Sequence, residues 1–309
     1  AEPVARASRD FDAADISDAP FGYNLPNWLI RKALLERLAD LPNVSFRTGI
    51  AVERLIARVS EARVRLSDGS SVTARMVIAA DGRNSPCREA LGIGVTKHSF
   101  GQQALTFAVG HDQPHDNVST EVHRSGGPFT LVPLPDYQGR PSSAVVWMET
   151  DENAKALLAL DEGDFSAAAT ERSAGALGPL TLISRRTSWP IISQLAHSFY
   201  GPRTALVAEA AHVMPPIGAQ GLNTSLKDLQ ALLDLCRDAP EGIGEEAMLR
   251  TYHRKRFADV AGRTVGVSVL NKASIAAPQP LRDARAAGLR MIHDIKPVRT
   301  ALMRLGLGV

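Results

Sequence analysis

Two short apolar segments, each leading into a carboxylate, constrain the fold of this chain more than any other feature. The first, residues 77–79, precedes Asp81 and Gly82, and the second, residues 205–208, precedes Glu209. Near-continuous apolar runs of this kind are typical of strands in buried parallel sheets. Ligands of open α/β sheets bind beyond the carboxyl ends of such strands. The sequence therefore predicts a ligand site that includes Asp81 and Glu209.

The region between these segments has a different pattern. Short apolar or β-branched runs lie between loops that are rich in Gly, Pro and polar residues, which is typical of antiparallel sheets. These runs cover residues 105–109, 129–133 and 143–148. The sequence predicts an α/β chain, α+β overall, in which an antiparallel-sheet domain is inserted into a layered nucleotide-binding type of domain.

Patterns elsewhere predict the remaining elements. An apolar stripe with interleaved charges predicts a helix over residues 27–39, and Asp68-Gly69 predicts a hairpin turn. Further strands are predicted at residues 44–47, 51–59, 62–66, 71–79 and 204–208, with a β-like run at residues 180–189. Further helices are predicted at residues 152–160, 165–174 and 222–236, and over most of the chain from residue 245.

Composition excludes several classes of protein. The 309 residues include 35 Lys and Arg, 33 Asp and Glu, and 5% aromatic residues, for a formal net charge of +2. This balance argues against a nucleic-acid binder. No apolar run approaches the ~18 residues of a membrane helix. Two cysteines, Cys87 and Cys236, are too few for a disulfide framework or a four-thiolate zinc site. The pattern favours a reducing compartment, the cytoplasm.

The first carboxylate motif predicts a strand, a turn and a short helix. Ser85 and Pro86 suit the N-cap and first position of a helix that ends at Leu91. The N-terminus of that helix favours an anion such as a pyrophosphate, and Arg88 is a candidate for added positive charge. Gly82 lets the backbone approach a bound group. A plain strand–turn–helix with a capping Ser explains the local pattern equally well.

The second motif carries more special residues than a plain loop needs. They are two prolines, two glycines and three cap-forming residues: Pro215, Pro216, Gly218, Gly221, Asn223, Thr224 and Ser225. The prolines stiffen the loop, and the glycines allow positive φ and close approach of the backbone to a flat ligand. Free N–H groups at the start of the following helix can stabilise negative charge. A rigid loop with ordinary glycine turns is the alternative, and the density of these residues favours a ligand site.

At these two motifs the chain resembles the FAD-dependent aromatic hydroxylases, the group A flavoprotein monooxygenases of the para-hydroxybenzoate hydroxylase type. The residues that match the family's Asp-Gly fingerprint are Asp81, Gly82, Ser85 and Arg88. The residues that match its Gly-Asp-Ala-Ala-His fingerprint are Ala210, Ala211, His212, Pro215, Gly218, Gly221 and Asn223. The stretch from Pro215 to Asn223, the Phe21-Gly22-Tyr23-Asn24 segment and the basic helical tail are similar to the ubiquinone-biosynthesis hydroxylase branch.

The resemblance implies a Rossmann-like FAD-binding domain with an inserted substrate domain. It assigns residues 1–95 to a partial FAD-binding domain and residues 96–195 to a substrate domain with a mixed or antiparallel sheet. Residues 196–240 return to the FAD-binding domain, and residues 241–309 form a C-terminal helical region.

The resemblance also implies FAD as the cofactor, with NAD(P)H as the electron donor. Asp81 and Gly82 are expected near the pyrophosphate and the ribityl chain, and Glu209 takes the place of an Asp that contacts the ribityl chain. Arg31 falls where many members place an Arg near the FAD phosphates. A solvated charge on a helix face explains Arg31 equally well.

The glycine-rich loop is implied to face the flavin ring. The backbone of Gly221, Leu222 and Asn223 is expected at the pyrimidine end, and Pro215 in the space between flavin and substrate. Gly218 is expected to shape this loop through its backbone freedom.

Two departures from the family pattern bear on cofactor binding. Ala208-Glu209 replaces the usual Gly-Asp, which adds a Cβ where the backbone should approach the cofactor and lengthens the acidic side chain. The family's N-terminal Gly-x-Gly-x-x-Gly unit, which binds the ADP half of FAD, has no match here, because Gly92-Ile93-Gly94 lacks the third Gly and the strand–helix context. The chain is expected to be an N-terminally incomplete copy with weakened FAD binding.

The implied activity is hydroxylation of a phenolic ring with O₂ through a flavin hydroperoxide, with a ubiquinone-precursor-like substrate. The alternatives are another oxidoreductase on the same FAD fold, such as a halogenase or an isoprenoid reductase, and a non-catalytic truncated remnant. Dispersal of Trp28, Trp147 and Trp189 counts against a halogenase. The absent Gly-rich unit supports the remnant.

No catalytic acid–base residue or metal site is assigned from the sequence. His212 is expected to be structural, and His111, His115 and His123 are expected in a solvated loop. The tail carries six basic residues: Arg282, Arg285, Arg290, Lys296, Arg299 and Arg304. Apolar residues recur there at helical spacing, which predicts helices that pack on the domain, or a peripheral contact with the inner face of an anionic membrane.

Overall fold

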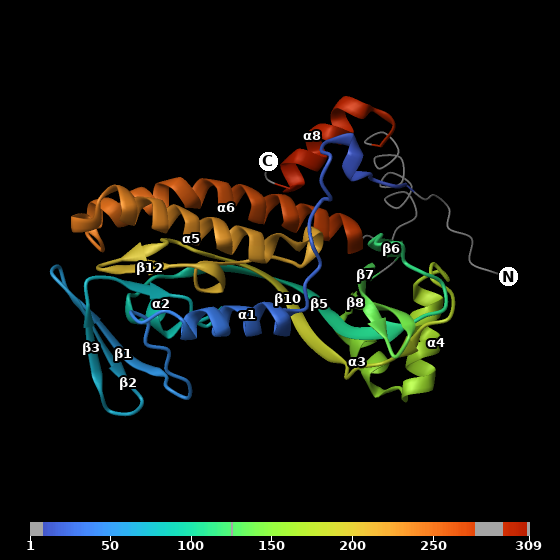
Figure 1. Cartoon of the computed structure of the whole chain (residues 1–309), viewed down its shortest axis with the longest axis horizontal. Coiled ribbons are helices and arrows are strands. Elements are labelled where there is room, and N and C mark those ends of the chain that lie inside the picture. Colours follow the sequence, from blue (N-terminus) through green and yellow to red (C-terminus); the bar gives the residue numbers. More distant parts are fainter. Residues whose placement is uncertain (1–8, 125, 276–292, 308–309) are drawn as a thin grey trace. The chain divides into compact units, whose positions relative to one another are not determined.

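The computed structural model describes residues 9–124, 126–275 and 293–307 (Figure 1). The chain divides into two compact units, and each unit is built from segments that are distant in the sequence. Unit 1 comprises Ala1–Arg37, Gly101–Pro190 and Asn271–Val309, and unit 2 comprises Leu38–Phe100 and Ile191–Leu270. The functional assignment of the four predicted segments stays a prediction.

Unit 1 is built on long antiparallel strands. The strands are β5 (Val95–Gly110), β6 (Thr120–Arg124), β7 (Gly127–Tyr137), β8 (Arg140–Thr150), β9 (Thr181–Leu182) and β10 (Thr187–Ala196), of which β5 and β10 continue into unit 2. Their order is β10-β5-β8-β7-β6, with β9 beside β5. The apolar runs predicted at residues 105–109, 129–133 and 143–148 lie within β5, β7 and β8, which pair antiparallel. The predicted antiparallel pattern is confirmed.

One face of this sheet packs on α3 (Asp151–Ala159) and α4 (Glu162–Arg172) (Figure 1). Phe107 of β5 and Trp147 of β8 both point to this face. Phe165 on α4 contacts both rings, with centroids 4.9 and 6.0 Å apart. These contacts form the apolar core of unit 1.

Unit 2 contains a short parallel pair of strands. β4 (Val77–Ala79) and β12 (Thr204–Leu206) run parallel, with Ala79 opposite Leu206, and β11 (Tyr200–Gly201) pairs with the other side of β12. The helices α5 (Gln220–Asp238) and α6 (Glu246–Ile275) contribute to the same core. Tyr252 on α6 is fully buried and donates a hydrogen bond to the Leu206 carbonyl at 2.8 Å. Burial raises the pKa of Tyr252, so this donor stays protonated.

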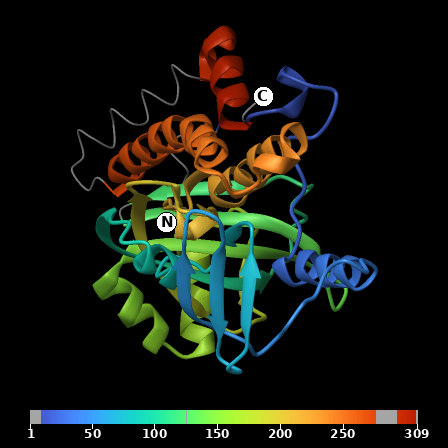
Figure 2. The ribbon, with the colours of Figure 1, turned by 90° about the vertical axis from the view of Figure 1, so that its left-hand side faces the viewer.

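A separate antiparallel sheet of unit 2 consists of β1 (Val52–Ala57), β2 (Ala62–Leu66) and β3 (Ser71–Ala74), which lie side by side at the front of Figure 2. The predicted turn at Asp68-Gly69 joins β2 to β3, and Gly69 has a φ of 81°. The single strand predicted over residues 71–79 is wrong. The chain leaves β3 at Ala74 and enters β4 at Val77, because β3 pairs antiparallel with β2 whereas β4 pairs parallel with β12.

Three other expectations also need correction. Residues 44–47 lie outside the described strands, and Val44 and Phe46 are exposed. The run at residues 180–189 splits into β9 and the start of β10. The strand predicted over residues 204–208 ends at Leu206, and a 3-10 turn, η2 (Ala208–Ala210), follows it.

The predicted helix at residues 27–39 is present as α1 (Asn27–Ala39), but none of its residues is buried. Trp28 and Leu34 are 67% and 60% exposed, so the apolar stripe does not form a core in this structure. In the C-terminal tail, Arg282, Arg285 and Arg290 lie outside the described residues. The helix α8 (Lys296–Leu307) follows, and its Arg299 pairs with Asp15 at 3.0 Å.

The remaining short elements are α2 (Pro86–Ala90), β13 (His212–Val213), η1 (Ala13–Asp15), η3 (Ile217–Ala219) and η4 (Pro240–Gly242).

Candidate functional site

The parallel pair β4 and β12 brings the two predicted carboxylates to one sheet edge. Asp81 lies two residues beyond the end of β4, and Glu209 lies three residues beyond the end of β12. The two strands are in register, with Ile78 opposite Ala205. Both side chains therefore leave the carboxyl edge of the same sheet, where open α/β sheets bind ligands.

Asp81 also caps the following helix. Its Oδ2 accepts a hydrogen bond from the Cys87 N–H at 3.0 Å, and Ser85 Oγ accepts one from the Arg88 N–H at 3.0 Å. The predicted N-cap at Ser85 and first helical position at Pro86 are confirmed. Burial opposes the ionised form of Asp81, but hydrogen bonds from Ser85 and Cys87 outweigh it and hold the pKa of Asp81 below its ordinary value. The same surroundings raise the pKa of the Cys87 thiol to about 12, because the thiol is buried beside the Asp81 carboxylate. Cys87 is therefore an unreactive thiol at neutral pH.

We expect Asp81→Asn to lower the free energy of unfolding in a pH-dependent way. A carboxyl whose pKa is lowered by folding stabilises the native state above its unfolded pKa, near 3.8, and that contribution disappears as the pH falls through the folded pKa. The difference between wild type and Asp81→Asn should be present at pH 6 and shrink below pH 4. Urea unfolding at several pH values measures it. A difference that grows on acidification would contradict this account of Asp81.

Arg83 joins the two strand-end loops. Its Nε and Nη2 each donate to one oxygen of the Glu209 carboxylate, both at 3.1 Å. The Glu209 side chain remains 49% exposed. Because a carboxylate has about four acceptor positions, Glu209 can still accept hydrogen bonds from a ligand hydroxyl. Gln194 on β10 also holds this loop, because its Nε2 donates a hydrogen bond to the Arg83 carbonyl at 2.9 Å.

Arg88 does not present its charge to a ligand. It is 4% exposed, and its guanidinium donates to the carbonyls of Ala210 and Arg83 at 2.9 and 3.0 Å. The suggestion that Arg88 adds positive charge to an anion site is therefore wrong. It ties the loop after β4 to the turn after β12 instead.

Gly82 and Gly221 leave open space beside the backbone. Gly82 has a φ of +84°, and a Cβ placed on Gly82 or Gly221 meets no heavy atom within 4 Å. Gly218 also has a positive φ, +70°, in the turn before α5. A ligand can thus approach the backbone closely at Gly82 and Gly221, whereas the Gln220 side chain lies beside Gly218. Pro215, in the same loop, is buried.

The helix α5 begins earlier than predicted, at Gln220 rather than Leu222. The expected cap residues therefore lie inside its first turns. Thr224 and Ser225 bond back to the carbonyls of Gln220 and Gly221 at 2.8 and 2.9 Å instead of capping the helix. The start of the helix has no side-chain cap, and Gly221, Leu222 and Asn223 are exposed. Their N–H groups belong to the first helical turn, which has no internal acceptor for them.

Ala208 has a left-handed backbone, with a φ of +52°. This conformation disfavours residues with a Cβ by ~1 kcal/mol, which explains why glycine is the usual residue at this place in the resemblance. We expect Ala208→Gly to raise the free energy of unfolding of unit 2 by ~1 kcal/mol, measured by urea unfolding. The matched control is Ala210→Gly in the same turn, where φ is not positive. The control substitution should destabilise instead, and equal effects at the two positions would show that backbone strain is not the cause.

His212 is structural, as expected. It is 3% exposed, and its Nε2 lies 2.7 Å from Asp228 Oδ2. His111 corrects another expectation, because it is fully buried rather than solvated and bonds to Gln113 O and Ser143 Oγ. No cluster of three metal-ligating side chains occurs among the described residues. Arg31 is exposed on the part of α1 that belongs to unit 1, and its predicted role stays a prediction.

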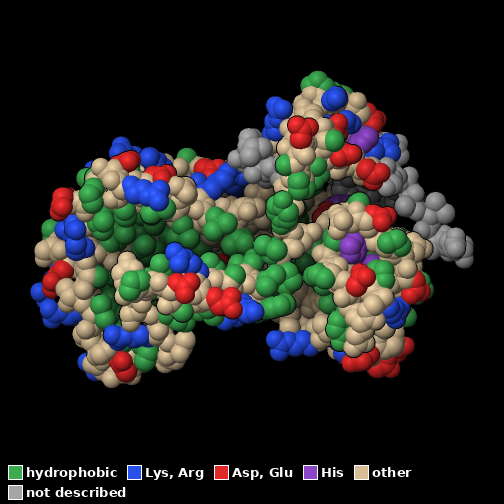
Figure 3. All heavy atoms as spheres, in the orientation of Figure 1, with side chains coloured by type: hydrophobic (Ala, Val, Ile, Leu, Met, Phe, Trp, Pro, Cys, Tyr) green, Lys and Arg blue, Asp and Glu red, His purple; other side chains and the backbone are tan. Residues whose placement is uncertain are grey.

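An apolar groove of about 480 Å³ lies elsewhere in unit 2, where hydrophobic side chains gather over α5 in Figure 3. It is lined by Ile78, Leu226, Leu229, Gln230, Leu232, Leu233 and Cys236. None of the predicted cofactor ligands lines it. Its wall is too poor in polar groups to hold a phosphate or a polyol.

The donor set at the strand ends fits the ribityl and ring half of a flavin. Carboxylates accept hydrogen bonds from polyol hydroxyls, and the free N–H groups of a helix N-terminus favour partial negative charge at a ring carbonyl. The open space beside the backbone of Gly82 and Gly221 leaves room for the ribityl chain and the ring. Sequence reasoning missed Arg83, Gln194 and Asp228, because their partners are far away in the chain.

Comparison with known proteins identifies relatives over nearly the whole chain. The family described as "FAD binding domain" matches residues 5–266. Ubiquinone hydroxylase UbiL of Rhodospirillum rubrum is 31% identical over 94% of this chain, and ubiquinone hydroxylase UbiM of Neisseria meningitidis is 28% identical over 92%. The chain spans 68% and 61% of the lengths of these two relatives.

Solved structures share the fold. The crystal structure of p-nitrophenol 4-monooxygenase PnpA from Pseudomonas putida matches 92% of this chain with a TM-score of 0.74 at 19% identity, and the match covers 72% of PnpA. The predicted fold class is confirmed. In the described part of the chain, no helix combines the length and apolar character that a membrane crossing needs.

Proposed function

Because the chain belongs to the FAD-binding domain family, we propose that it acts in an FAD-dependent monooxygenase that hydroxylates a phenolic ring, with a ubiquinone precursor as the substrate class. One observation carries the proposal: β4 and β12 bring Asp81 and Glu209 to one sheet edge in the same unit as the uncapped start of α5. When bound, FAD supplies the redox and oxygen-activating chemistry, with NAD(P)H as the electron donor.

Residues of this chain bind and orient the cofactor in this proposal. Glu209 accepts hydrogen bonds from ribityl hydroxyls while Arg83 holds its carboxylate in place. The N–H groups of Leu222 and Asn223 face the pyrimidine end, where they stabilise negative charge on the ring. Asp81 and Gly82 form the side of the cofactor site opposite Glu209. The hydrogen bond from the Cys87 N–H holds the Asp81 carboxylate in place.

We assign the aromatic substrate to unit 1. Leu105, Phe107 and Val109 of β5 point into the core, so the alternating Thr106 and Ala108 point to the other face of the sheet. Thr106 Oγ1 lies 2.6 Å from Thr187 Oγ1 on that face. Small side chains with hydroxyl groups leave room for a ring and can bond a phenolic oxygen.

We also propose that α8 contributes to a peripheral membrane contact. Arg299 is engaged with Asp15, which leaves Lys296 and Arg304 as the basic side chains of α8 available to lipid. Sedimentation with anionic vesicles should pull down more protein than sedimentation with neutral vesicles, and the Lys296→Gln/Arg304→Gln variant should lose the difference. If wild type and the variant sediment equally with anionic vesicles, the proposed membrane contact of α8 is wrong.

Isotope transfer tests the activity. The chain is loaded with FAD, supplied with NADH or NADPH and a prenylated phenol, and incubated under ¹⁸O₂. The proposal expects one ¹⁸O atom in a hydroxylated product, and a loss of product in Glu209→Ala. Unlabelled or absent product from folded, flavin-loaded chain would overturn the proposed function.

A further inference from the structure

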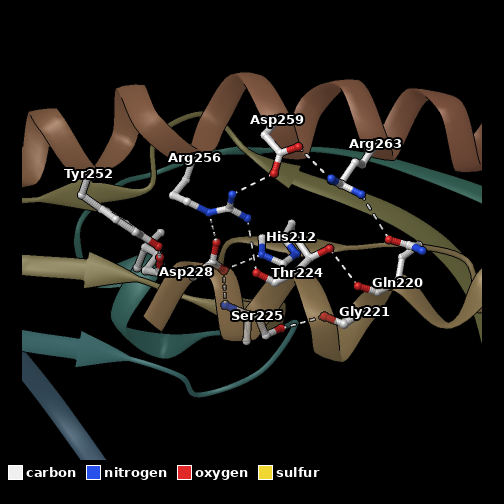
Figure 4. A network of polar contacts seen from close by, with 12 residues as sticks. His212, Gln220, Gly221, Thr224, Ser225, Asp228, Tyr252, Arg256, Asp259 and Arg263 are labelled. Atoms are coloured by element: carbon white, nitrogen blue, oxygen red, sulfur yellow. Dashed lines mark hydrogen bonds and ion pairs between the residues drawn. The ribbon is translucent and has the colours of Figure 1, made fainter. Parts of the chain in front are cut away.

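A connected set of buried and half-buried polar side chains links the turn after β12 to the first turn of α5 (Figure 4). Its centre is Asp228 on α5, which is fully buried. The Asp228 carboxylate accepts from Arg256 Nε at 2.8 Å, from His212 Nε2 at 2.7 Å and from the Ala208 N–H at 3.2 Å. Because an ionised carboxylate can only accept, His212 donates through Nε2.

From Asp228 the set continues along α6 to the start of α5. Arg256 is 6% exposed and donates to Asp259 at 2.8 Å and to the Thr224 carbonyl at 3.3 Å. Asp259 in turn accepts from Arg263 at 2.7 Å, and Arg263 donates to Gln220 Oε1 at 3.3 Å. We call Asp228, Arg256, Asp259 and Arg263 the α5–α6 network.

The two ends of the α5–α6 network lie beside two strained residues. Ala208, whose N–H bonds to Asp228, has a φ of +52°. Ala219, directly before Gln220, has a φ of +51°. An alanine adopts this left-handed conformation only when its surroundings impose it. The network therefore bonds to the strained residue itself in the first loop and to the residue after the strained Ala219 in the second.

Stability alone does not account for the buried charges of Asp228 and Arg256. Well-packed apolar residues stabilise a helix pair as well as a buried ion network does, because desolvation of the charges offsets much of their attraction. Directional hydrogen bonds do what apolar packing cannot: they fix the position of a particular backbone N–H or side-chain amide. Hydrogen bonds hold Arg256 charged, against burial, so its pKa is raised.

We propose that Asp228, Arg256 and Arg263 are positioning residues that hold the Glu209 turn and the first turn of α5 in the conformation that receives the flavin. The effect on loop geometry stands on the structure alone, and the effect on flavin affinity rests on the proposed function. None of these residues is placed in contact with the cofactor.

Amide hydrogen exchange of Asp228→Asn tests the loop geometry. The asparagine side chain keeps a single acceptor oxygen, which cannot accept from Arg256 on one side and from Ala208 and His212 on the other. We expect the charged Arg256 to keep this oxygen as its acceptor. Exchange at Ala208, Ala210 and Ala211 should then rise about ten- to a hundredfold, while amides of β7 and β8 in unit 1 keep their rates. The matched control is Asp234→Asn, an Asp on the same helix that accepts only from Gln230 in the described contacts.

Rescue by glycine separates positioning from general destabilisation. Glycine adopts a φ near +52° without strain, so Ala208→Gly in the Asp228→Asn background should return the rates at Ala210 and Ala211 to within about threefold of wild type. The amide of residue 208 itself should stay fast, because its acceptor on Asp228 is lost. Arg263→Gln should instead raise exchange at Thr224 and Ser225 and leave Ala208 unchanged. A uniform rise across unit 2 without rescue, or no rise in Asp228→Asn, would overturn the proposal.

Flavin titration provides the second readout. In fluorescence titrations with FMN, Asp228→Asn should raise the dissociation constant about tenfold or more, and Ala208→Gly should recover part of the loss. If wild type binds no flavin, the proposed function fails, and the exchange experiment still decides whether the network positions the loops. If Asp228→Asn binds FMN as tightly as wild type, the flavin part of the proposal is wrong.

Discussion

Replacement of Arg256 with methionine is expected to lower the free energy of unfolding of unit 2 by about 3–5 kcal/mol. Methionine fills much of the same volume but leaves the Asp228 carboxylate buried without its counter-charge. Asp228 is fully buried and Arg256 is 6% exposed, so water cannot replace the lost partner. The loss should exceed that of any exposed ion pair on the same helix.

The three tryptophans make this effect measurable unit by unit. Trp28, Trp147 and Trp189 all belong to unit 1, so tryptophan fluorescence follows unit 1, and amide exchange in α5 and α6 follows unit 2. The control is Arg250→Met, because Arg250 and its partner Glu246 are exposed and such pairs contribute less than ~1 kcal/mol. An Arg256→Met chain no less stable than this control would contradict the account.

The cost of Arg256→Met can also be measured in the Asp228→Asn variant. With the negative charge removed, Arg256→Met no longer leaves an unpaired charge, so its cost should fall well below the value in wild type. A double-mutant cycle measures this coupling. Additive costs would show that Asp228 and Arg256 act independently.

Arg88→Met is expected to lower the free energy of unfolding of unit 2 by about 1–3 kcal/mol. The Ala210 carbonyl loses its side-chain donor and is left buried and unsatisfied, whereas the Arg83 carbonyl keeps the hydrogen bond from Gln194. The hydrogen bonds by which Arg88 connects the loop of Asp81 to the turn of Glu209 are also lost, so the affinity for flavin should fall. Urea unfolding followed by amide exchange measures the first effect.

The control for Arg88 is Arg63→Met on β2. Arg63 is exposed and pairs with Glu61 at 3.5 Å, so its loss should change stability by less than ~0.5 kcal/mol. If both variants unfold at the same urea concentration, the burial of Arg88 has no energetic consequence and its bridging role is wrong.

The strands and the two carboxylates could be predicted from the sequence because their signals are local. A short apolar run ending at Asp81, and another ending near Glu209, each carry the pattern of a buried parallel strand within a few residues. The cap at Ser85 is equally local, since the side chain bonds three residues ahead. The structure shows β4 and β12 side by side, as those patterns require.

The partners of the site residues could not be predicted in the same way. Arg83 and Glu209 meet at 3.1 Å although 126 residues separate them, and no pattern along the chain pairs a particular Arg with a particular Glu. Arg88 looks like a cation for a phosphate until the fold buries it between two loops. The α5–α6 network depends on how two helices face each other, which periodicity does not specify.

Errors at element ends have a common physical origin. Residues 71–79 are apolar or β-branched throughout most of their length, but the chain must change sheets between Ala74 and Val77. The early start of α5 follows from Thr224 and Ser225, which bond back to the preceding turn rather than cap. In both cases tertiary pairing decides where an element ends.

The placement of the flavin at the strand ends is tested by an FMN titration followed at individual backbone amides. FMN carries the ring, the ribityl chain and one phosphate, which are the parts assigned to the strand ends of unit 2. We expect saturating FMN to shift the amide signals of Gly82, Glu209 and Leu222 and to slow their exchange, and we expect Glu209→Ala to weaken binding. Folded chain whose signals at these residues stay unchanged at millimolar FMN, or change only at the apolar groove on α5, would contradict the placement of the flavin.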